Sequence, residues 1–309
     1  MKKYIFGVDL GGTSVKLGLF DKDGELVEKW EIPTRKEENG KYVLEDIAQA
    51  VLKKAEEKKI QEEVLGIGIG VPGPVTEDGV VKGCVNIGWG EINVEQELGK
   101  RTGYLVKAGN DANVAALGEL WQGGGKGFQN LVMVTLGTGV GGGVIINGKI
   151  LAGTNGAAGE IGHMPVVYDE TEYCNCGKKG CLEQVASASG IVKETKKILA
   201  ASSADSVLRG RQISAKAVFD ALKEGDALAL EAGERLGKYL GIALAHIAAV
   251  VDPEVFVIGG GVSKAGEVLI ELVQKYYIEN AFLPSRKAKF ALATLENDAG
   301  IYGAAKLLL

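Results

Sequence analysis

Several features are scarce in this sequence of 309 residues, and each scarcity removes a class of protein. No run of apolar residues approaches the ~18 to 20 that a membrane-spanning helix needs. The opening Met1-Lys2-Lys3 is basic like the start of a secretion signal, but the apolar stretch behind it stops at Asp9, which is too early for a signal core. We therefore expect a cytoplasmic protein with no membrane partner.

Positive charge is not in excess either. Lys and Arg number 35 against 40 for Asp and Glu, so the net charge is -5. Nucleic acids and anionic membranes attract basic proteins, and neither is expected here as the main partner. At ~150 residues per domain the length predicts two domains with ample core and no need for a disulfide framework.

Glycine is the one abundant outlier. The sequence has 46 glycines but only 6 prolines, without the fixed glycine period of collagen. This share is roughly twice the usual ~7%. Because glycine lets the backbone approach another group closely, we expect backbone to be brought near a ligand.

The first part of the chain predicts a mixed α/β unit. Strands are expected at 4–8 and 15–20 around a glycine turn, then a helix at 42–60 and a glycine-interrupted buried strand at 64–71. A helical segment at 93–101 and a strand at 104–108 then lead to Asn110-Asp111.

The pattern then repeats. A shift of 126 residues places Asp9 on Thr135 and Gly11 on Gly137. The second copy has strands at 131–136, 144–146, 255–259 and 288–293, with helices at 227–251, 263–278 and 298–308. The repeat is too long for a solenoid of ~20 to 50 residues, so it indicates a duplication. We expect a small α/β domain of residues 1–112 plus 298–309 and a large one of 113–297.

Both copies carry a glycine turn between two strands. One such turn alone is more often only a tight turn. The repetition and the third run Gly259-Gly260-Gly261 instead favour a site in which backbone N–H groups cradle phosphate. We expect the two turns to face each other across a cleft. Neither turn has the Walker A spacing or leads into a helix as a dinucleotide motif does.

Three of the four cysteines lie within eight residues, at Cys174, Cys176 and Cys181. In a reducing compartment this crowding favours a metal over disulfides, and tetrahedral zinc wants a fourth N or S ligand. Only two histidines exist, and His246 lies in an apolar helical stretch, which favours a core or helix-face residue. The isolated Cys84 is expected to be a small buried thiol.

Six strings in order resemble the ROK family, which includes repressors and sugar kinases. They are Asp9-Leu-Gly-Gly-Thr13 with Lys16, Asn110-Asp111-Ala-Asn113, Leu136 to Gly143, Gly159-Glu160-Ile-Gly-His163, Cys174 to Glu183, and Gly259-Gly-Gly-Val262. The likeness runs from residue 4 to about residue 305. It implies a duplicated actin-like and hexokinase-like (ribonuclease H-like) α/β fold of two domains around a central cleft, in agreement with the duplication.

The resemblance also implies the activity: ATP-dependent phosphorylation of glucose to glucose 6-phosphate by in-line transfer, with Asp111 as general base. Phosphoryl transfer needs positioning, charge neutralisation and a group that accepts the alcohol proton. The alternative role of Asp111, an N-cap for a helix at 112–121, is compatible with the catalytic one. The family's sugar contacts fall on Asn86, Asn110, Asp111, Glu160, His163 and Glu183.

The remaining site residues concern the nucleotide and the metals. Asp9 would hold hydrated Mg²⁺, and ATP phosphates would meet Gly11, Gly12, Thr13, Gly137, Thr138 and Gly139. Lys16 would add positive charge, although a solvated strand lysine is an equal alternative. Gly259, Gly260 and Gly261 resemble the adenosine-proximal loop, with close helix–strand packing as the alternative.

The resemblance makes His163 the fourth ligand of a structural Zn²⁺ with Cys174, Cys176 and Cys181. Four protein ligands leave no open position for chemistry. The ion would instead hold Glu160, His163 and Glu183 in place for the sugar.

Other functions compete with a glucose kinase in glycolysis. A kinase for mannose, fructose or N-acetylmannosamine is possible within the same family. A sugar-responsive repressor would carry a helix-turn-helix domain ahead of the first strand, which here begins at residue 4. A filament-forming or chaperone-type ATPase shares the architecture but would not need the zinc loop. Family members are commonly oligomers, so a homo-oligomer, dimer or tetramer, is expected.

Overall fold

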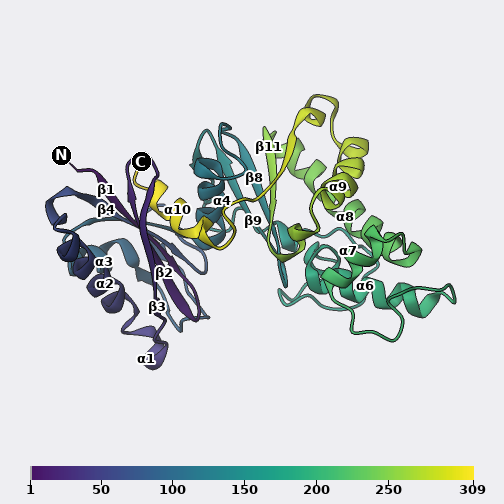
Figure 1. Ribbon diagram of the computed structural model, residues 1–309, viewed down its shortest axis with the longest axis horizontal. Coiled ribbons are helices and arrows are strands. Elements are labelled where there is room, and N and C mark those ends of the chain that lie inside the picture. Colours follow the sequence, from purple (N-terminus) through teal and green to yellow (C-terminus); the bar gives the residue numbers. More distant parts are fainter. Residues whose placement is uncertain (1) are drawn as a thin grey trace. The chain divides into compact units, whose positions relative to one another are not determined.

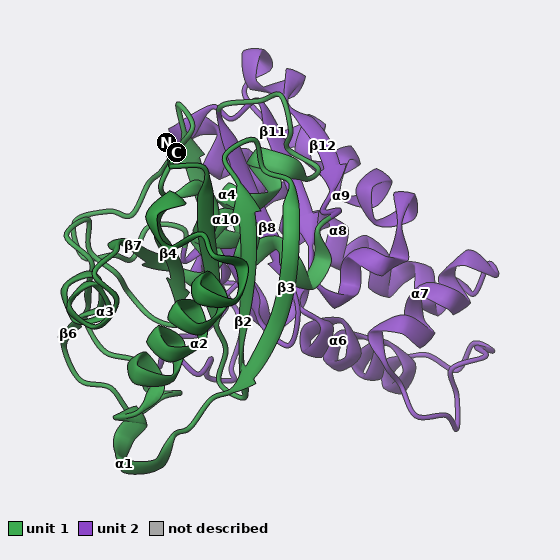
Figure 2. Ribbon diagram, turned by 60° about the vertical axis from the view of Figure 1, so that its left-hand side comes forward, with its two compact units in different colours: residues 1–129, 143–159, 295–309 green, residues 130–142, 160–294 purple. Residues whose placement is uncertain are grey.

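The computed structural model describes residues 2–309, which form two compact units (Figure 2). The first unit holds the chain up to Gln129, Gly143–Gly159 and Leu295–Leu309, and the second holds Asn130–Gly142 and Glu160–Thr294. The domain limits expected at 112 and 297 stay a prediction. In the structure the whole helix that follows Asn110 belongs to the first unit. Within residues 2–309, none of the helices combines the length and the apolar character of a membrane span.

The first unit is built on a five-stranded sheet with the order β3-β2-β1-β4-β7. These strands are β1 (Tyr4–Leu10), β2 (Ser14–Asp21), β3 (Leu26–Pro33), β4 (Val64–Val71) and β7 (Leu105–Asn110). The first three pair antiparallel, whereas β1, β4 and β7 run parallel. The carboxyl ends of these parallel strands therefore meet at one edge of the sheet.

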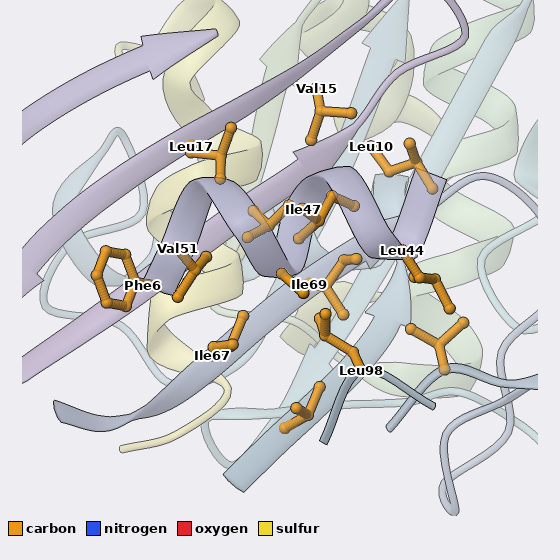
Figure 3. Packing of buried hydrophobic residues seen from close by; sticks show 14 of the residues in the cluster. Phe6, Leu10, Val15, Leu17, Leu44, Ile47, Val51, Ile67, Ile69 and Leu98 are labelled. Atoms are coloured by element: carbon orange, nitrogen blue, oxygen red, sulfur yellow. The ribbon is translucent and has the colours of Figure 1, made fainter. Parts of the chain in front are cut away.

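Helices cover both faces of this sheet. One face packs on α2 (Val43–Lys58) and α3 (Val94–Thr102), and Figure 3 shows Ile47 and Val51 of α2 among the strand residues. The other face packs on α10 (Ala299–Lys306), beside α4 (Asp111–Gln122). Successive side chains of a strand point to opposite faces, so Ile5 meets α10 while Phe6 joins the α2 cluster.

The close approach of α10 to β4 explains why this strand contains glycine. A Cβ atom built on Gly68 would lie 1.6 Å from the carbonyl oxygen of Ala304, so only glycine lets α10 pack this closely. The glycine-interrupted pattern predicted at 64–71 is thus a helix-packing surface.

The second sheet has the order β10-β9-β8-β11-β12. Strand by strand, this order matches β3-β2-β1-β4-β7 of the first sheet. Its strands are β8 (Leu131–Leu136), β9 (Val140–Ile146), β10 (Lys149–Ile150), β11 (Val255–Gly259) and β12 (Lys289–Leu292), and the limit between the units falls within β9. The second unit adds α6 (Ala188–Ala201), α7 (Ala215–Lys223), α8 (Ala227–Val251) and α9 (Glu267–Asn280), labelled in Figure 1. The matching order confirms the duplication inferred from the sequence.

Some elements differ from expectation. The strand β3 and the helices α6 and α7 were not predicted. The helix expected at 263–278 is instead a 3-10 turn, η3 (Gly261–Ala265), followed by α9, because Gly266 at φ 78° separates the two. Short elements complete the chain: α1 (Glu37–Gly40), η1 (Gln61–Glu63), β5 (Val80–Val81), β6 (Ile92–Asn93), η2 (Ile161–His163), α5 (Glu183–Ala186), η4 (Leu283–Lys287) and η5 (Glu296–Asp298).

Candidate active site and metal centre

Asp9 and Asp111 lie at the shared carboxyl edge of the parallel strands in the first unit. Asp9 is near the end of β1, where it pairs in register with Gly70 of β4, and Asp111 directly follows β7. Burial raises the pKa of Asp9 to about 6; the positive charge of Lys16 opposes the rise, and the negative charge of Asp111 adds to it. Two interacting carboxylates at one edge are suited to a cation or to a proton-transfer step.

The local bonds of Asp111 orient its carboxylate. Its Oδ1 accepts hydrogen bonds from the Ala112 backbone N–H at 2.8 Å and from Nδ2 of Asn110 at 3.0 Å. Asn110 also donates to the Gly73 carbonyl at 3.1 Å, and its Oδ1 accepts from the Asn113 backbone N–H at 3.1 Å. The N-cap of α4 is therefore Asn110, and the alternative in which Asp111 caps a helix starting at 112 is wrong.

The first glycine turn lies between β1 and β2. Thr34 donates its hydroxyl to the Gly11 carbonyl at 2.7 Å and its backbone N–H to the Thr13 carbonyl at 3.0 Å, which fixes the turn from outside. Both bonds from Thr34 go to carbonyl oxygens, and the Gly11 N–H bonds the Ser14 carbonyl at 3.0 Å, so it is the N–H groups of Gly12 and of the exposed Thr13 that these bonds do not engage. The turn can therefore still offer backbone N–H groups to a ligand.

Two lysines approach this region differently. Lys16, expected near phosphate, donates from Nζ to the carbonyl of Asn297 at 2.9 Å. Lys36 was not predicted, yet its Nζ lies 3.4 Å from where a Cβ of Gly12 would be. Lys36 thus brings positive charge onto the glycine turn itself.

Asn86 lies on an exposed turn. The Cys84 backbone N–H bonds the Trp89 carbonyl at 3.0 Å, and Trp89 donates from Nε1 to the Gly40 carbonyl at 3.0 Å. Ile87 is buried, whereas Asn86 is exposed. The turn is therefore anchored by its apolar members and presents Asn86 to solvent. Cys84 is 2% exposed, which confirms the buried thiol.

The second unit brings four metal-ligating side chains together: His163, Cys174, Cys176 and Cys181. Their ligand atoms all lie within 4.8 Å of one another. The sulfurs of Cys176 and Cys181 are 3.5 Å apart, and Cys174 Sγ is 3.7 Å from His163 Nδ1. Tetrahedral ligands with Zn–S bonds of ~2.3 Å require separations of this size, so the set fits zinc. His246 lies outside this cluster and is exposed on α8. Of the two positions expected for it, core or helix face, it therefore takes the helix face.

The two nitrogens of His163 face different groups. Nδ1 faces Cys174, with Glu183 Oε1 at 3.8 Å, whereas Nε2 lies 4.0 Å from a carboxylate oxygen of Glu160. Glu183 also accepts a hydrogen bond from Cys174 Sγ at 2.9 Å. One nitrogen can thus serve a metal while the other stays beside Glu160. The metal ligands and both glutamates form one continuous group.

The glycine loop of the second copy borders that group. A Cβ on Gly139 would lie 2.5 Å from Glu183 Oε2. Gly137, Gly139 and Gly260 line one open hollow of about 360 Å³ with Thr135, Val140, Gly141 and Glu183. Gly260, at φ 84°, approaches the end of β8, since its Cβ would lie 2.6 Å from the Leu136 carbonyl oxygen. Two of the predicted glycine runs therefore share one hollow, while Gly259 is buried behind it and Thr138 is exposed.

Gly261 lines another, smaller cavity of about 160 Å³. It lies between α7 and η3, and its lining mixes apolar and charged side chains: Ala215, Lys216, Phe219, Asp220, Lys223, Gly261, Val262, Lys264 and Ala265. No motif in the sequence pointed to it, because α7 itself was not predicted.

The six predicted sugar contacts divide between the units. Asn86, Asn110 and Asp111 belong to the first, whereas Glu160, His163 and Glu183 belong to the second. Within each unit the structure gathers Asn110 with Asp111, and His163 with both glutamates. The cleft between the two groups stays a prediction.

The duplicated sheets, the two carboxylates at one sheet edge and the Cys₃His cluster belong to an α/β protein of two compact units. The ROK family profile matches residues 5–309, and the chain belongs to the ROK family. It is 44% identical to a glucokinase of Halalkalibacterium halodurans, over 97% of this chain and 93% of that protein. It is 38% identical to a glucokinase of Thermotoga maritima, over 99% and 98%. Among solved structures, a Streptomyces griseus ROK glucokinase in complex with glucose and AMPPNP superposes with a TM-score of 0.73 at 33% identity, covering 98% of each chain.

Proposed function

We propose that this chain is an ATP-dependent glucokinase that converts glucose to glucose 6-phosphate, with Asp111 as the general base. The observation that carries the proposal is the position of Asp9 and Asp111 at the same carboxyl edge of the parallel strands β1, β4 and β7. The similarity to two glucokinases and to a glucokinase holding glucose and an ATP analogue supports the same reaction.

Asp111 accepts the proton of the sugar hydroxyl as its oxygen attacks the γ-phosphorus of ATP. The oxygen–phosphorus bond to the sugar forms, the bond to ADP breaks on the opposite side, and the proton goes to the carboxylate. The bond from Asn110 to Oδ1 of Asp111 keeps the carboxylate oriented toward the hydroxyl. A base so positioned contributes about 10² to 10⁴ in rate.

Asp9 is the residue that would hold Mg²⁺ through its water shell. Hard oxygen ligands and a single carboxylate suit this ion, and a buried carboxylate with a pKa raised to about 6 gains from a nearby cation. Mg²⁺ supplies charge neutralisation on the phosphates when bound.

The phosphates are held by backbone in both copies, at Gly11, Gly12 and Thr13 and at Gly137, Thr138 and Gly139. Lys36 adds positive charge at Gly12, and Lys16 contributes to the potential around Asp9. The run Gly259 to Gly261 leads from the glycine hollow to the cavity with Phe219 and Val262, whose size and mixed lining suit the nucleotide base.

The Cys₃His cluster would hold a structural Zn²⁺. Four protein ligands leave no position for water, so the ion's contribution is to fix the loop. Because Nδ1 of His163 faces the cysteines, Nε2 stays available to a sugar hydroxyl beside Glu160. Glu183, Asn86 and Asn110 complete the sugar contacts. Sites that hydrogen-bond hydroxyls reject sugars that lack them.

We also infer a homo-oligomer. In the second unit Val250 is 84% exposed, and Phe282 and Leu283 are each 70% exposed. A second copy of the chain packed on these side chains would remove their apolar surface from water. Sedimentation velocity tests this, and a single species at the mass of one chain contradicts it.

A coupled assay of ADP release tests the activity. It compares glucose, mannose, fructose and N-acetylmannosamine at fixed Mg-ATP, with a reaction lacking sugar as the control. The proposal expects glucose to give the highest kcat/KM. Equal ATP hydrolysis with every sugar and with none would favour a chaperone-type or filament-forming ATPase.

A further inference from the structure

Glu119 is a buried carboxylate that no step of the reaction uses. It lies in the last turn of α4 and is 0% exposed. Its Oε2 accepts a hydrogen bond from the Gly124 backbone N–H at 2.8 Å, and its Oε1 accepts one from the Leu295 backbone N–H at 2.9 Å. A buried charge is retained only where such bonds compensate for its lost hydration.

These two bonds fasten segments that are distant in sequence. Leu295 is the residue at which the chain re-enters the first unit, and Gly124 precedes the point after Gln129 at which it leaves. Glu296, the next residue, has φ 48°, a left-handed conformation that favours glycine. Asn297 in turn accepts the bond from Lys16 at 2.9 Å. The returning segment is thus held in an unfavourable backbone conformation by contacts on both sides.

The returning segment leads directly into α10, which touches the proposed reactive groups. A Cβ on Gly300 would lie 2.6 Å from the Asp9 carboxyl carbon, so the first turn of α10 packs on Asp9. A Cβ on Gly303 would lie 1.7 Å from the Val114 carbonyl oxygen, so α10 also packs on α4 near its start. Helix α4 begins with Asp111.

We propose that Glu119 is a positioning residue, which holds the returning segment on α4 and thereby sets Asp9 relative to Asp111. The inference rests on the proposed kinase reaction but not on which carboxylate is its base. Helix α4 is the common element, with Asp111 at its first position and Glu119 in its last turn.

The first test is Glu119→Gln. An amide offers one acceptor where two backbone N–H groups need one each, so either Gly124 or Leu295 loses its bond. We expect kcat per folded molecule to fall about tenfold or more, since small misplacements of reacting groups cost up to ~10²-fold. The KM for glucose should stay within about twofold of the wild-type value, because the group displaced through α10 is Asp9, which is not one of the proposed sugar contacts. Circular dichroism at the assay temperature gives the folded fraction.

The control for stability is Val51→Ala, in the α2 cluster on the opposite face of the sheet. It removes buried apolar volume without touching α4 or α10, so a purely structural role for Glu119 predicts the same kinetics for both variants once corrected for folded fraction. A Glu119→Gln enzyme with kcat within about twofold of wild type, or equal to that of Val51→Ala, overturns the proposal.

A second pair of variants decides the matter if Glu119→Gln does not fold. Leu295 has φ -83°, close to the range of proline, so Leu295→Pro removes the N–H that Glu119 binds together with the leucine side chain. Leu295→Ala keeps that N–H and is the matched control. We expect kcat to fall in the proline variant alone, and equal kcat in the two overturns the proposal. All variants are compared with the wild-type rate of sugar phosphorylation. If Asp111 is not the base, the variant Asp111→Asn keeps its activity, whatever the Glu119 variants show. An enzyme that phosphorylates no sugar would instead refute the proposed function.

Discussion

Asn110 donates a hydrogen bond from its side-chain amide to Oδ1 of Asp111 at 3.0 Å while its own oxygen caps the helix that Asp111 begins. The same amide also holds the Gly73 carbonyl. One residue therefore ends β7, starts α4 and orients the carboxylate. The four bonds around this pair make Asp111 a fixed group at the end of the sheet.

Asn110→Ala should lower kcat and destabilise the protein together. Loss of an N-cap side chain costs about 0.5–2 kcal/mol, and Asp111 loses the donor that orients it. We expect kcat to fall about tenfold, less than the ~10² to 10⁴ that a positioned base contributes, because the base is displaced and not removed. The control Asn93→Ala removes the cap of α3, where Asn93 accepts from the Gln96 backbone N–H. It should destabilise comparably and leave kcat unchanged; equal kcat losses would show that capping alone matters.

Asp9→Asn should raise thermal stability and abolish turnover. The pKa of Asp9 is raised from 3.8 to about 6 in the folded protein. A raised carboxyl pKa means that the folded state binds an extra proton between these values, so stability is lost as the pH rises through this window. At pH 7 the ionised group costs on the order of 1–3 kcal/mol.

The amide carries no charge, so Asp9→Asn should melt higher than wild type at pH 7 and no higher at pH 3. Differential scanning calorimetry without nucleotide or Mg²⁺ measures this, and ADP release measures turnover. Equal melting temperatures at pH 7 would contradict the burial of a charged Asp9, whereas normal turnover would contradict its role toward Mg²⁺.

Lys36→Met should raise the KM for Mg-ATP without changing the KM for glucose. The Nζ atom lies beside Gly12, so its removal takes positive charge from the turn that would hold phosphate. A rise of about tenfold corresponds to a loss of ~1.4 kcal/mol, typical of one exposed charge–phosphate contact. Lys41→Met is the control, since Lys41 is exposed and pairs with Glu38. Indistinguishable KM values for the two variants would remove Lys36 from the site.

Removing zinc should raise the KM for sugar and lower the melting temperature. The ligands His163, Cys174, Cys176 and Cys181 adjoin Glu160 and Glu183, so a loosened loop displaces the sugar contacts. Incubation with a chelator followed by elemental analysis, melting and kinetics tests this, and Cys176→Ser provides a genetic counterpart. Cys84→Ser, which changes a buried thiol outside the cluster, is the control. A metal-free enzyme with unchanged KM would refute the positioning role of the ion.

The parts that the sequence predicted are those with local signals. The strand at 64–71 was predicted to the residue because its apolar run is bounded on both sides. The duplication was visible as repeated glycine turns, and the identical strand order of the two sheets confirms it. Close spacing alone pointed to the three cysteines, whereas His163 was named from the family resemblance; the structure brings all four side chains together.

The parts that escaped prediction depend on contacts distant in sequence. The strand β3 alternates half-buried and exposed residues and carries charges at two of its exposed positions, Lys29 and Glu31, so its apolar signal is weak. Lys16 and Asn297 meet across 281 positions, and Glu119 and Leu295 across 176, which no spacing rule reveals. Lys36 reaches Gly12 only because Thr34 holds the intervening segment on the turn.

The central claim is that Asp111 takes the proton of the sugar, and Asp111→Asn tests it most directly. Asparagine keeps the shape of the side chain but cannot act as a base at neutral pH. Glucose affinity is measured by isothermal titration calorimetry and kcat by ADP release on the same preparation, with Asp23→Asn as a surface control. The account predicts a glucose Kd within about threefold of wild type and a kcat lower by about 10²- to 10⁴-fold. A variant that retains more than about a tenth of the wild-type kcat would contradict it.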